Sequence, residues 1–505
     1  MSTLRRALSE RWREPDDVTV FEGPLGPEKR VALTERDAVA RLASIRTELV
    51  GRGIGVGDRV GVLSNHRVET YLAVLGVVST GATFVPLNPK FPVERLRTIV
   101  DLAQPKVILG DPSTRARHEE IVPDTAFIDV SSIEPDPALG GEWNDAVDAA
   151  TTEADAIAYV MFTSGSTGTP KGVPISYGNL LAYVDGVANL LGIPEHSRFS
   201  QFFDLSFDLS MHDIFVSMRA RGTLVAPSQV DLMMPGAYVA RERIDAWFSV
   251  PLLGAQLGGG ARKTDFAGFR SMLFCGEALP METVVACRPW LADGGRMWNL
   301  YGPTEATIAF TAADVTDSPR HEGNASIGRA FGVNVTALLD TDGHVVTEPE
   351  LDSEGELLLG GPQVFAGYST DAPSPFVEHE GVTFYRSGDL VRIDAEGVYF
   401  RGRVDSQVKF RGYRIELGEI ETVARRTFGR KTLAVVVAGD GASARLVMYH
   451  LASENEAGHD IDLRALADTL PVYMIPAEAI ALDVMPTNQN GKIDRRELAA
   501  RAKGN

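Results

Sequence analysis

The sequence has only two cysteines, Cys275 and Cys287, with neither metal-type spacing nor companion histidines. This excludes a disulfide framework, gives no zinc site, and predicts a reducing cytoplasm as the compartment. No apolar run approaches the roughly 20 residues needed to span a bilayer, and the basic N-terminal segment has no apolar stretch behind it. We therefore expect a soluble, cytoplasmic protein with no secretion signal and no membrane partner.

Positive charge is also in short supply. The 505 residues include 49 Lys and Arg against 68 Asp and Glu, which gives a net charge of -19. A surface of this sign repels a polyphosphate backbone, which argues against nucleic acid as the principal partner. ATP remains compatible, because a small anion needs only a local site.

The first part of the chain alternates short apolar runs with helical patterns. Arg59–Leu63 and Lys106–Leu109 are such runs, and Val68–Val78 has apolar residues at helical spacing. This alternation is typical of βαβ units and predicts a largely parallel sheet. From about Asn334 the elements become short and are separated by glycines, which predicts antiparallel strands.

The last hundred residues have a different pattern. A charged helix is expected at Glu416–Arg426, a strand at Leu433–Ala438 and a further helix near Ile461–Leu470. These elements predict a small α+β domain. The junction after Gly402 is rich in glycine and charge, as expected of a hinge.

One loop has the composition of a phosphate site. In Ala156–Val173 an apolar strand runs into the loop TSGSTGTPKG, where glycines such as Gly165 let the backbone approach an anion. The order differs from a Walker loop, and the alternative is a flexible surface turn. The groups available to a phosphate are the hydroxyls of Thr163, Ser164, Ser166 and Thr167 and the ammonium of Lys171.

Four further motifs accompany this loop in a fixed order: NLYGPTE from Asn299, YRSGDL from Tyr385, GRVDSQVKFRGYRIELGEIE from Gly402 and NGKIDR from Asn490. Together they resemble the adenylate-forming superfamily, over nearly the whole chain. The closest similarity is to stand-alone nonribosomal-peptide-synthetase-type amino acid adenylation domains and to D-alanine:carrier-protein ligases. The resemblance implies an α/β fold with a large N-terminal domain, residues 1–403, of two doubly wound sheets and a small distorted β-barrel. It also implies a small, mobile α+β C-terminal lid, residues 404–505, that turns about Asp405.

The resemblance also implies roles for single residues. Glu305 holds Mg²⁺, a cation that prefers oxygen ligands, and it acts with Thr304 and Lys492 in catalysis. Without the motif, Glu305 would be an exposed helix-start residue and Lys492 an ordinary surface lysine. The nucleotide is bound by the adenine-stacking Tyr301, the ribose-binding Asp389, and Asn299, Gly302 and Arg403.

The substrate pocket is carried over in the same way. Asp208 matches the aspartate that pairs with a substrate α-ammonium, and the alternative is an aspartate that caps a helix. His212 either binds a polar substituent or is a satisfied core histidine. The lining predicts a small or medium aliphatic amino acid; its other members are Phe207, Leu209, Leu252, Leu273, Cys275, Gly276, Leu300, Ile308 and Ala309.

The function implied is therefore ATP- and Mg²⁺-dependent formation of an aminoacyl-adenylate, followed by transfer to the phosphopantetheine thiol of a separate carrier protein. A basic cluster at Arg425, Arg426, Arg430 and Lys431 offers a dock for an acidic carrier, or is a solvated helix end. Two alternatives remain: an acyl-CoA or aryl-CoA ligase of the same superfamily, and a non-catalytic nucleotide-binding homologue.

Overall fold

Two compact units make up the chain. The computed structural model describes residues 12, 15–25, 29–64, 66–140, 143, 153–165, 169–258, 266–320, 322–370, 373–405, 407–439, 441–454, 461–487 and 493–503. The first unit comprises Met1–Pro89, Leu102–Met161 and Gly172–Val404, and the second comprises Lys90–Asp101, Phe162–Lys171 and Asp405–Asn505. Among the described residues, no helix has the length and apolar character needed to cross a bilayer.

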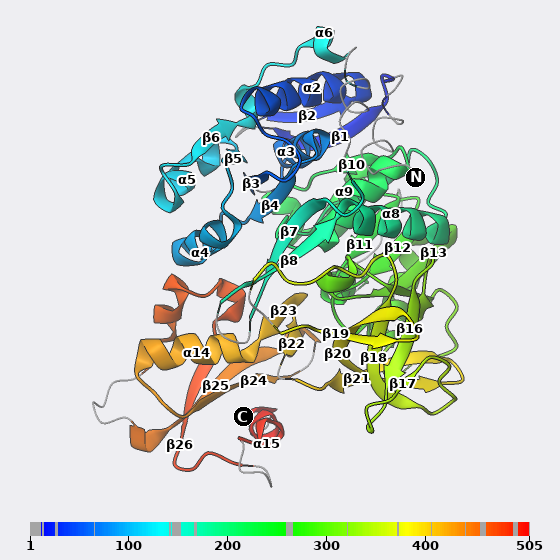
Figure 1. The fold of residues 1–505 in the computed structure, drawn as a ribbon. Coiled ribbons are helices and arrows are strands. Elements are labelled where there is room, and N and C mark those ends of the chain that lie inside the picture. Colours follow the sequence, from blue (N-terminus) through cyan, green and yellow to red (C-terminus); the bar gives the residue numbers. More distant parts are fainter. Residues whose placement is uncertain are drawn as a thin grey trace. The chain divides into compact units, whose positions relative to one another are not determined.

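A six-stranded sheet is built from the first βαβ units, and its strands β3 to β7 are labelled in Figure 1. The paired neighbours from β6 through β5, β3 and β4 to β7 run parallel, as the alternating pattern predicts. In sheet order the strands are β6 (Ala126–Asp129), β5 (Val107–Gly110), β3 (Arg59–Leu63), β4 (Thr83–Leu87), β7 (Ile157–Thr163) and β8 (Lys171–Ser176).

A nine-stranded mixed sheet forms the rest of the α/β core. Its centre, from β13 to β1, is parallel, and the edge strands β2, β14 and β15 are antiparallel. In sheet order the strands are β15 (Arg329–Ala330), β14 (Thr311–Asp314), β13 (Leu291–Tyr301), β12 (Phe269–Phe274), β11 (Ala246–Ser249), β9 (Arg198–Ser200), β10 (Thr223–Val225), β1 (Thr19–Leu25) and β2 (Lys29–Thr34).

One helix packs against both sheets. Every residue of α3 (Val68–Thr80) is buried, and the helix contacts β3, β4 and β5 of one sheet and β1 of the other. A helix that is apolar all round requires such a covered position. The remaining helices up to residue 300 are α2 (Glu35–Gly51), α4 (Val93–Ala103), α5 (Arg115–Ile121), α6 (Pro137–Gly140), α8 (Tyr177–Leu191), α9 (Leu209–Arg219), α10 (Gln229–Met233), α11 (Pro235–Glu242), α12 (Pro251–Gly258) and α13 (Met281–Cys287).

A third sheet is entirely antiparallel, in keeping with the short, glycine-punctuated elements expected beyond Asn334. Its long strand β20 pairs with β18, β19 and β21, which brings the YRSGDL motif into the middle of the sheet. The strands are β17 (Val345–Val346), β16 (Val335–Leu339), β18 (Glu354–Gly360), β20 (Val382–Asp394), β19 (Phe376–His379) and β21 (Gly397–Arg403).

The second unit has a small α+β core. Its helix α14 (Leu417–Phe428) buries Ile420, Val423 and Ala424 among the side chains of β24 and β25. The expected helix near Ile461–Leu470 forms only as a short 3-10 helix, Leu463–Asp468, before Pro471. The other elements are the β22 (Gln407–Phe410) and β23 (Tyr413–Glu416) hairpin, β24 (Leu433–Ala438), β25 (Arg445–Leu451), β26 (Glu478–Leu482) and α15 (Arg495–Lys503).

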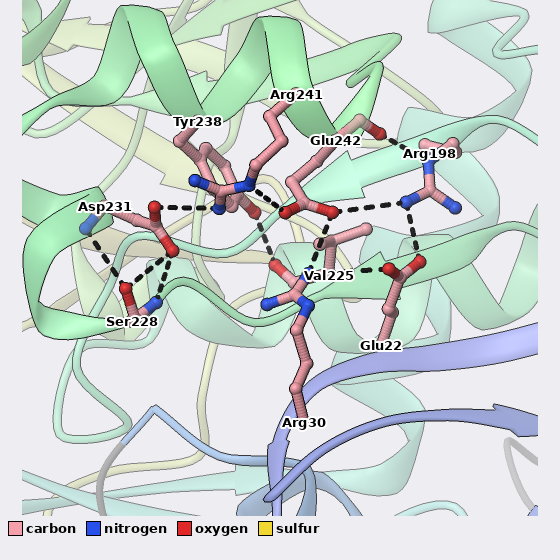
Figure 2. Close-up of polar contacts among 9 residues, drawn as sticks. All are labelled: Glu22, Arg30, Arg198, Val225, Ser228, Asp231, Tyr238, Arg241 and Glu242. Atoms are coloured by element: carbon pink, nitrogen blue, oxygen red, sulfur yellow. Dashed lines mark hydrogen bonds and ion pairs between the residues drawn. The ribbon is translucent and has the colours of Figure 1, made fainter.

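A charged network ties the first two strands to the centre of the first unit (Figure 2). Glu242, at the end of α11, is buried and accepts an ion pair from Arg30 of β2 at 2.8 Å. It also pairs with Arg241 at 2.6 Å, while Arg198 lies 3.8 Å away and pairs with Glu22 of β1 at 2.7 Å. One buried carboxylate thus stands among three guanidinium groups.

We expect Glu242→Gln to lower the free energy of unfolding by about 1–3 kcal/mol, because it leaves these cations without their shared anion. The value lies below that of a fully buried pair because the arginine side chains are partly exposed. The measurement is the urea midpoint of the intact protein. Glu48→Gln is the control, since Glu48 and Arg52 form an exposed pair on α2; equal losses in the two variants would contradict the expectation.

Candidate active site

A buried carboxylate lies on the central strand of the third sheet. Asp389 on β20 pairs in register with Arg403 on β21, and the guanidinium contacts Asp389 Oδ1. Arg403 also donates to the carbonyl oxygen of Ser387 at 3.2 Å. The hydroxyl of Tyr301 donates to Asp389 Oδ2 at 2.6 Å. Burial first, and then the charge of Asp389, raise the pKa of Tyr301 well above its usual value, so this hydroxyl stays a donor.

The strand that carries Tyr301 also carries an unused acceptor. Asn299 Nδ2 donates to the carbonyl oxygen of Ser326 at 2.8 Å, whereas its buried Oδ1 has no hydrogen-bond partner within the described part of the chain. A polar atom in this position fits a donor on a bound molecule, such as the amino group of a nucleobase. Gly302 is required sterically, because a Cβ there would lie 2.6 Å from Ala309 Cα.

Glu305 lies in a 3-10 helix, Thr304–Ala306, that follows β13. It is 1% exposed, so the alternative of an exposed helix-start residue is wrong for this chain. The Tyr368 hydroxyl donates to Glu305 Oε1 at 2.8 Å, and the backbone carbonyl accepts from the amide of Phe365 at 2.9 Å. Thr304 beside it is half-buried. The carboxylate is therefore held in a fixed direction.

A second buried carboxylate begins α9. Asp208 occupies the N-cap position, but its side chain makes no capping hydrogen bond, so the helix-cap alternative is wrong. It is 8% exposed. Burial, followed by the charge of Asp208, raises the pKa of Tyr159 well above its usual value, and Asp208 acts in the same direction on Tyr183. Asp208 is therefore close enough to both tyrosines for its charge to act on them.

His212 lies one helical turn after Asp208. Its Nδ1 is 2.7 Å from the Tyr183 hydroxyl, and its ring centroid is 4.5 Å from that of Phe248. Complete burial lowers the pKa of His212 to about 3, so the imidazole is neutral at physiological pH. Sequence analysis did not find Tyr183 or Tyr159, because an isolated tyrosine in an apolar helix or strand is indistinguishable from core packing.

The neutral state of His212 has a consequence for stability. In the unfolded chain the imidazole titrates near 6.5, so acid favours the unfolded state, which accepts the proton, and the contribution is lost as the pH falls below 6.5. Between pH 7.5 and pH 5 we expect wild type to lose about 2 kcal/mol more than His212→Gln, whose amide still accepts from Tyr183. Asp213, a buried carboxyl with a raised pKa, is common to both proteins. Denaturation curves at several pH values measure the difference, and parallel pH dependences would contradict it.

The apolar lining gathers at the carboxyl ends of neighbouring parallel strands. Leu273 lies near the end of β12, and Leu300 lies near the end of β13, which pairs with it. Cys275 and Gly276 follow β12 directly, with Gly276 at φ 93°. Phe207 and Leu252 are partly buried. The other expected lining residues are fully buried, namely Leu209, Leu273, Cys275, Leu300, Ile308 and Ala309.

One wall of this lining has an unusual backbone. Thr307 and Ile308 both have positive φ, at 58° and 69°, which is costly for β-branched residues. Gln363, fully buried, holds the turn by donating from Nε2 to the carbonyl oxygens of Ala309 at 2.8 Å and of Ala306 and Thr307 at 3.3 Å. Gln363 is a further positioning residue that the sequence did not indicate.

Gln363→Leu keeps the side-chain size but removes this donor. We expect the KM for the amino acid to rise about tenfold. The turn that carries Ile308 loses its hydrogen-bond donor, while the three carbonyl oxygens that accepted from it stay buried. The KM for ATP should change less than threefold. Steady-state kinetics with each substrate varied separately tests this, and equal changes in both KM values would point to general loss of structure instead.

The Ser/Thr/Gly loop belongs to the second unit. Gly165 allows a close turn, since a Cβ there would meet the carbonyl oxygen of Thr169 at 2.1 Å. Ser164 Oγ donates to the carbonyl oxygen of Arg414 at 3.0 Å and accepts from the amide of Glu416 at 3.2 Å, so its hydroxyl has protein partners here. Thr163 and Lys171 are half-buried at the ends of β7 and β8. Ser166, Thr167 and Lys492 lie outside the described residues.

Two other expectations concern the second unit. Asp405 is exposed and accepts from the amide of Gln407 at 3.1 Å, as a residue in a turn would. The proposed basic dock is wrong for Arg430, which is 6% exposed, and Arg425 is engaged with Glu421 at 3.3 Å. Arg426 and Lys431 are exposed.

Comparisons with known proteins identify the family. The family model of AMP-binding enzymes matches residues 9–369. An L-proline--[L-prolyl-carrier protein] ligase of Streptomyces coelicolor is 33% identical over 92% of this chain and 91% of its own, and one of Pseudomonas fluorescens is 32% identical over 95% and 97%. The adenylation domain AlmE of Vibrio cholerae, solved in complex with glycyl-adenosine-5'-phosphate, superimposes with a TM-score of 0.85 at 26% identity over 99% of this chain and 98% of that one.

These matches confirm the resemblance and the expected α/β fold with its mixed sheets and half-barrel. The family model ends at Ser369, past Glu305 but before Asp389, whereas both ligases align beyond it. Agreement among a family model, two relatives and a solved fold leaves one assignment: the chain belongs to the AMP-binding enzyme family and is an amino-acid-adenylating ligase.

Proposed function

We propose that the protein activates a small or medium aliphatic amino acid with ATP and loads it onto a carrier protein. The carboxylate oxygen of the amino acid attacks the α-phosphorus, the α–β anhydride bond breaks, and pyrophosphate leaves. The thiol of a phosphopantetheine arm then attacks the acyl carbon of the adenylate, and AMP leaves as the thioester forms. The relatives named for proline and carrier protein support this direction.

The buried Asp208 is the observation that carries the proposal. A carboxylate among apolar lining residues is costly unless a cation balances it, and the α-ammonium of an amino acid supplies that charge. Fatty and aryl acids have no such group. The apolar side chains of Leu209, Leu273 and Leu300 then favour an aliphatic substituent.

The nucleotide half is supported by the donors and acceptors of the first unit. Asn299 Oδ1 offers an acceptor to the adenine amino group, and the Asp389 carboxylate offers its remaining lone pairs to ribose hydroxyls. The oxygen ligands of Glu305 fit Mg²⁺, which would neutralise charge on the triphosphate. Lys171 and Lys492 are proposed, by the family pattern, to neutralise the phosphates and the attacking carboxylate.

The positioning of these groups is the contribution of the protein to catalysis. Because the in-line displacement needs no covalent enzyme intermediate, orientation and charge neutralisation account for the acceleration. β13 and the segment after it carry residues of both the nucleotide site and the amino acid site. Leu300 adjoins Tyr301 on β13, and Glu305 comes three residues before Ile308. The two substrates are thereby held by one continuous segment.

ATP–pyrophosphate exchange with a panel of L- and D-amino acids, including proline and glycine, tests the proposal. Fatty and aryl acids serve as controls. Exchange with an aliphatic amino acid supports it, and exchange restricted to non-amino acids would place the protein among acyl ligases. Release of AMP on addition of free CoA, with no carrier protein present, would contradict carrier loading, and the absence of any exchange would indicate a non-catalytic homologue.

A further inference from the structure

The second nitrogen of His212, Nε2, indicates which kind of side chain the amino acid has. We infer that the amino acid carries a hydroxyl group on an otherwise aliphatic side chain, that His212 Nε2–H donates to this hydroxyl, and that Tyr183 is the positioning residue that makes Nε2 the donor. This inference rests on the proposed function, because the amino acid must first be held by Asp208.

The direction of the Tyr183–His212 hydrogen bond follows from the strength of the two groups. Both are uncharged, since burial keeps the phenol protonated and the imidazole neutral. Either direction leaves one hydrogen of the pair unused. A neutral imidazole nitrogen is a stronger acceptor than a phenol oxygen, and a phenol is the stronger donor, so the phenol donates to Nδ1. The unused hydrogen is then on Nε2.

This remaining donor has no acceptor among the residues that the structure describes. His212 is 0% exposed, and Nε2 has no hydrogen-bond partner in the described part of the chain. A buried donor without an acceptor weakens the folded or the bound state by a factor of roughly ten to a hundred, so such groups in native proteins normally serve a ligand or a water.

The position of the donor relative to Asp208 fits a side-chain substituent. Residues four apart share one face of a helix and are displaced by about 6 Å along its axis. Tyr183 lies near both groups, since its hydroxyl is 2.7 Å from His212 Nδ1 and the charge of Asp208 is, after burial, one of the causes that raise its pKa. An amino acid whose ammonium is at Asp208 therefore extends its β- and γ-atoms toward His212.

The chemistry of the lining selects a hydroxyl among oxygen acceptors. A side-chain carboxylate would add a second negative charge beside Asp208, and the neutral His212 cannot balance it. An amide would bring two N–H donors against the apolar surfaces of Leu273 and Leu300. A hydroxyl brings a single oxygen and one hydrogen. Cys275, in the same buried cluster as these leucines, has a polarisable sulfur that can lie against this hydrogen.

The test uses amino acids matched in shape that differ by a hydroxyl against a methyl group. These pairs are serine and 2-aminobutyrate, threonine and valine, and homoserine and norvaline. We expect kcat/KM in pyrophosphate exchange to favour the hydroxyl member of at least one pair by tenfold or more. Exchange in which the methyl member is equal or better in every pair would overturn the inference while leaving the proposed function intact.

Three variants separate positioning from folding. His212→Leu should reverse the preference toward the methyl member, whereas His212→Gln, which keeps an N–H donor, should retain part of it. Tyr183→Phe should reduce the hydroxyl preference at least threefold through the KM of the hydroxyl substrate, with little change for its methyl partner. A preference that survives both His212→Leu and Tyr183→Phe would overturn the inference. Exchange with no amino acid at all would overturn the proposed function together with it.

Discussion

Asp208→Asn is expected to raise the KM for the amino acid about 100-fold, with the KM for ATP nearly unchanged. The substitution keeps the shape of the side chain and removes the charge that we assign to the α-ammonium. Truncating one member of a buried, hydrogen-bonded charge pair weakens binding by about 2–5 kcal/mol, and each 1.4 kcal/mol is a factor of ten. Pyrophosphate exchange at varied amino acid concentration measures the effect.

Asp213→Asn is the matched control. Asp213 lies on α9 and is buried too, at 1% exposed against 8% for Asp208, and burial raises its pKa well above the usual value, which favours the neutral acid. Its conversion to the neutral amide should change the amino acid KM by less than threefold. An Asp208→Asn variant that binds the amino acid as wild type does would mean that the ammonium is held by another group.

Asp389→Asn is expected to raise the KM for ATP about 100-fold, while the amino acid KM changes less than threefold. The carboxylate is buried, balances Arg403 and receives the Tyr301 hydroxyl, so its loss leaves a guanidinium without its anion and removes the acceptor proposed for ribose. ATP titration by calorimetry and exchange at varied ATP concentration both measure it.

Tyr301→Phe distinguishes the effect of the Asp389 carboxylate from that of the Tyr301 hydroxyl. It removes one hydrogen bond and leaves the charge, so we expect an increase of about tenfold at most in the ATP KM. The unfolding midpoint of each variant controls for damage to the sheet. An Asp389→Asn protein that folds and binds ATP with wild-type affinity would exclude the ribose role.

Much of the fold was predictable because local pattern and packing agree. The strand at Leu433–Ala438 forms with the expected bounds, since a β-branched run is buried between α14 and α15. The pairing of β1 with β10 was not predictable, because it joins segments about 200 residues apart in the chain. The helix expected at Ile461–Leu470 was weakened by Pro471 and by the Asp462 side chain, which supports a tighter 3-10 turn.

The candidate site was predictable where charge must be buried, and less so elsewhere. Asp208, Glu305 and Asp389 are ionisable groups in short motifs, and the structure places all three in the interior of the first unit. Tyr183 and Gln363 carry no motif; their importance comes from the hydrogen-bond direction of His212 and from a strained turn, and both are properties of three-dimensional contact. Ser164 is the opposite case: its motif predicts a phosphate contact, whereas in the structure its hydroxyl bonds to the backbone of the second unit.

The placement of β1 also constrains how this protein comes into being on the ribosome. Thr19–Leu25 emerges early, but its parallel partner Thr223–Val225 and the Glu242 carboxylate that holds Arg30 are made about 200 residues later. At typical synthesis rates of about 5–20 residues per second, the β1–β2 hairpin waits for roughly 10–40 s before its sheet exists. During that interval its unpaired edge can pair with the strands of other chains, so aggregation during synthesis is the hazard of this topology.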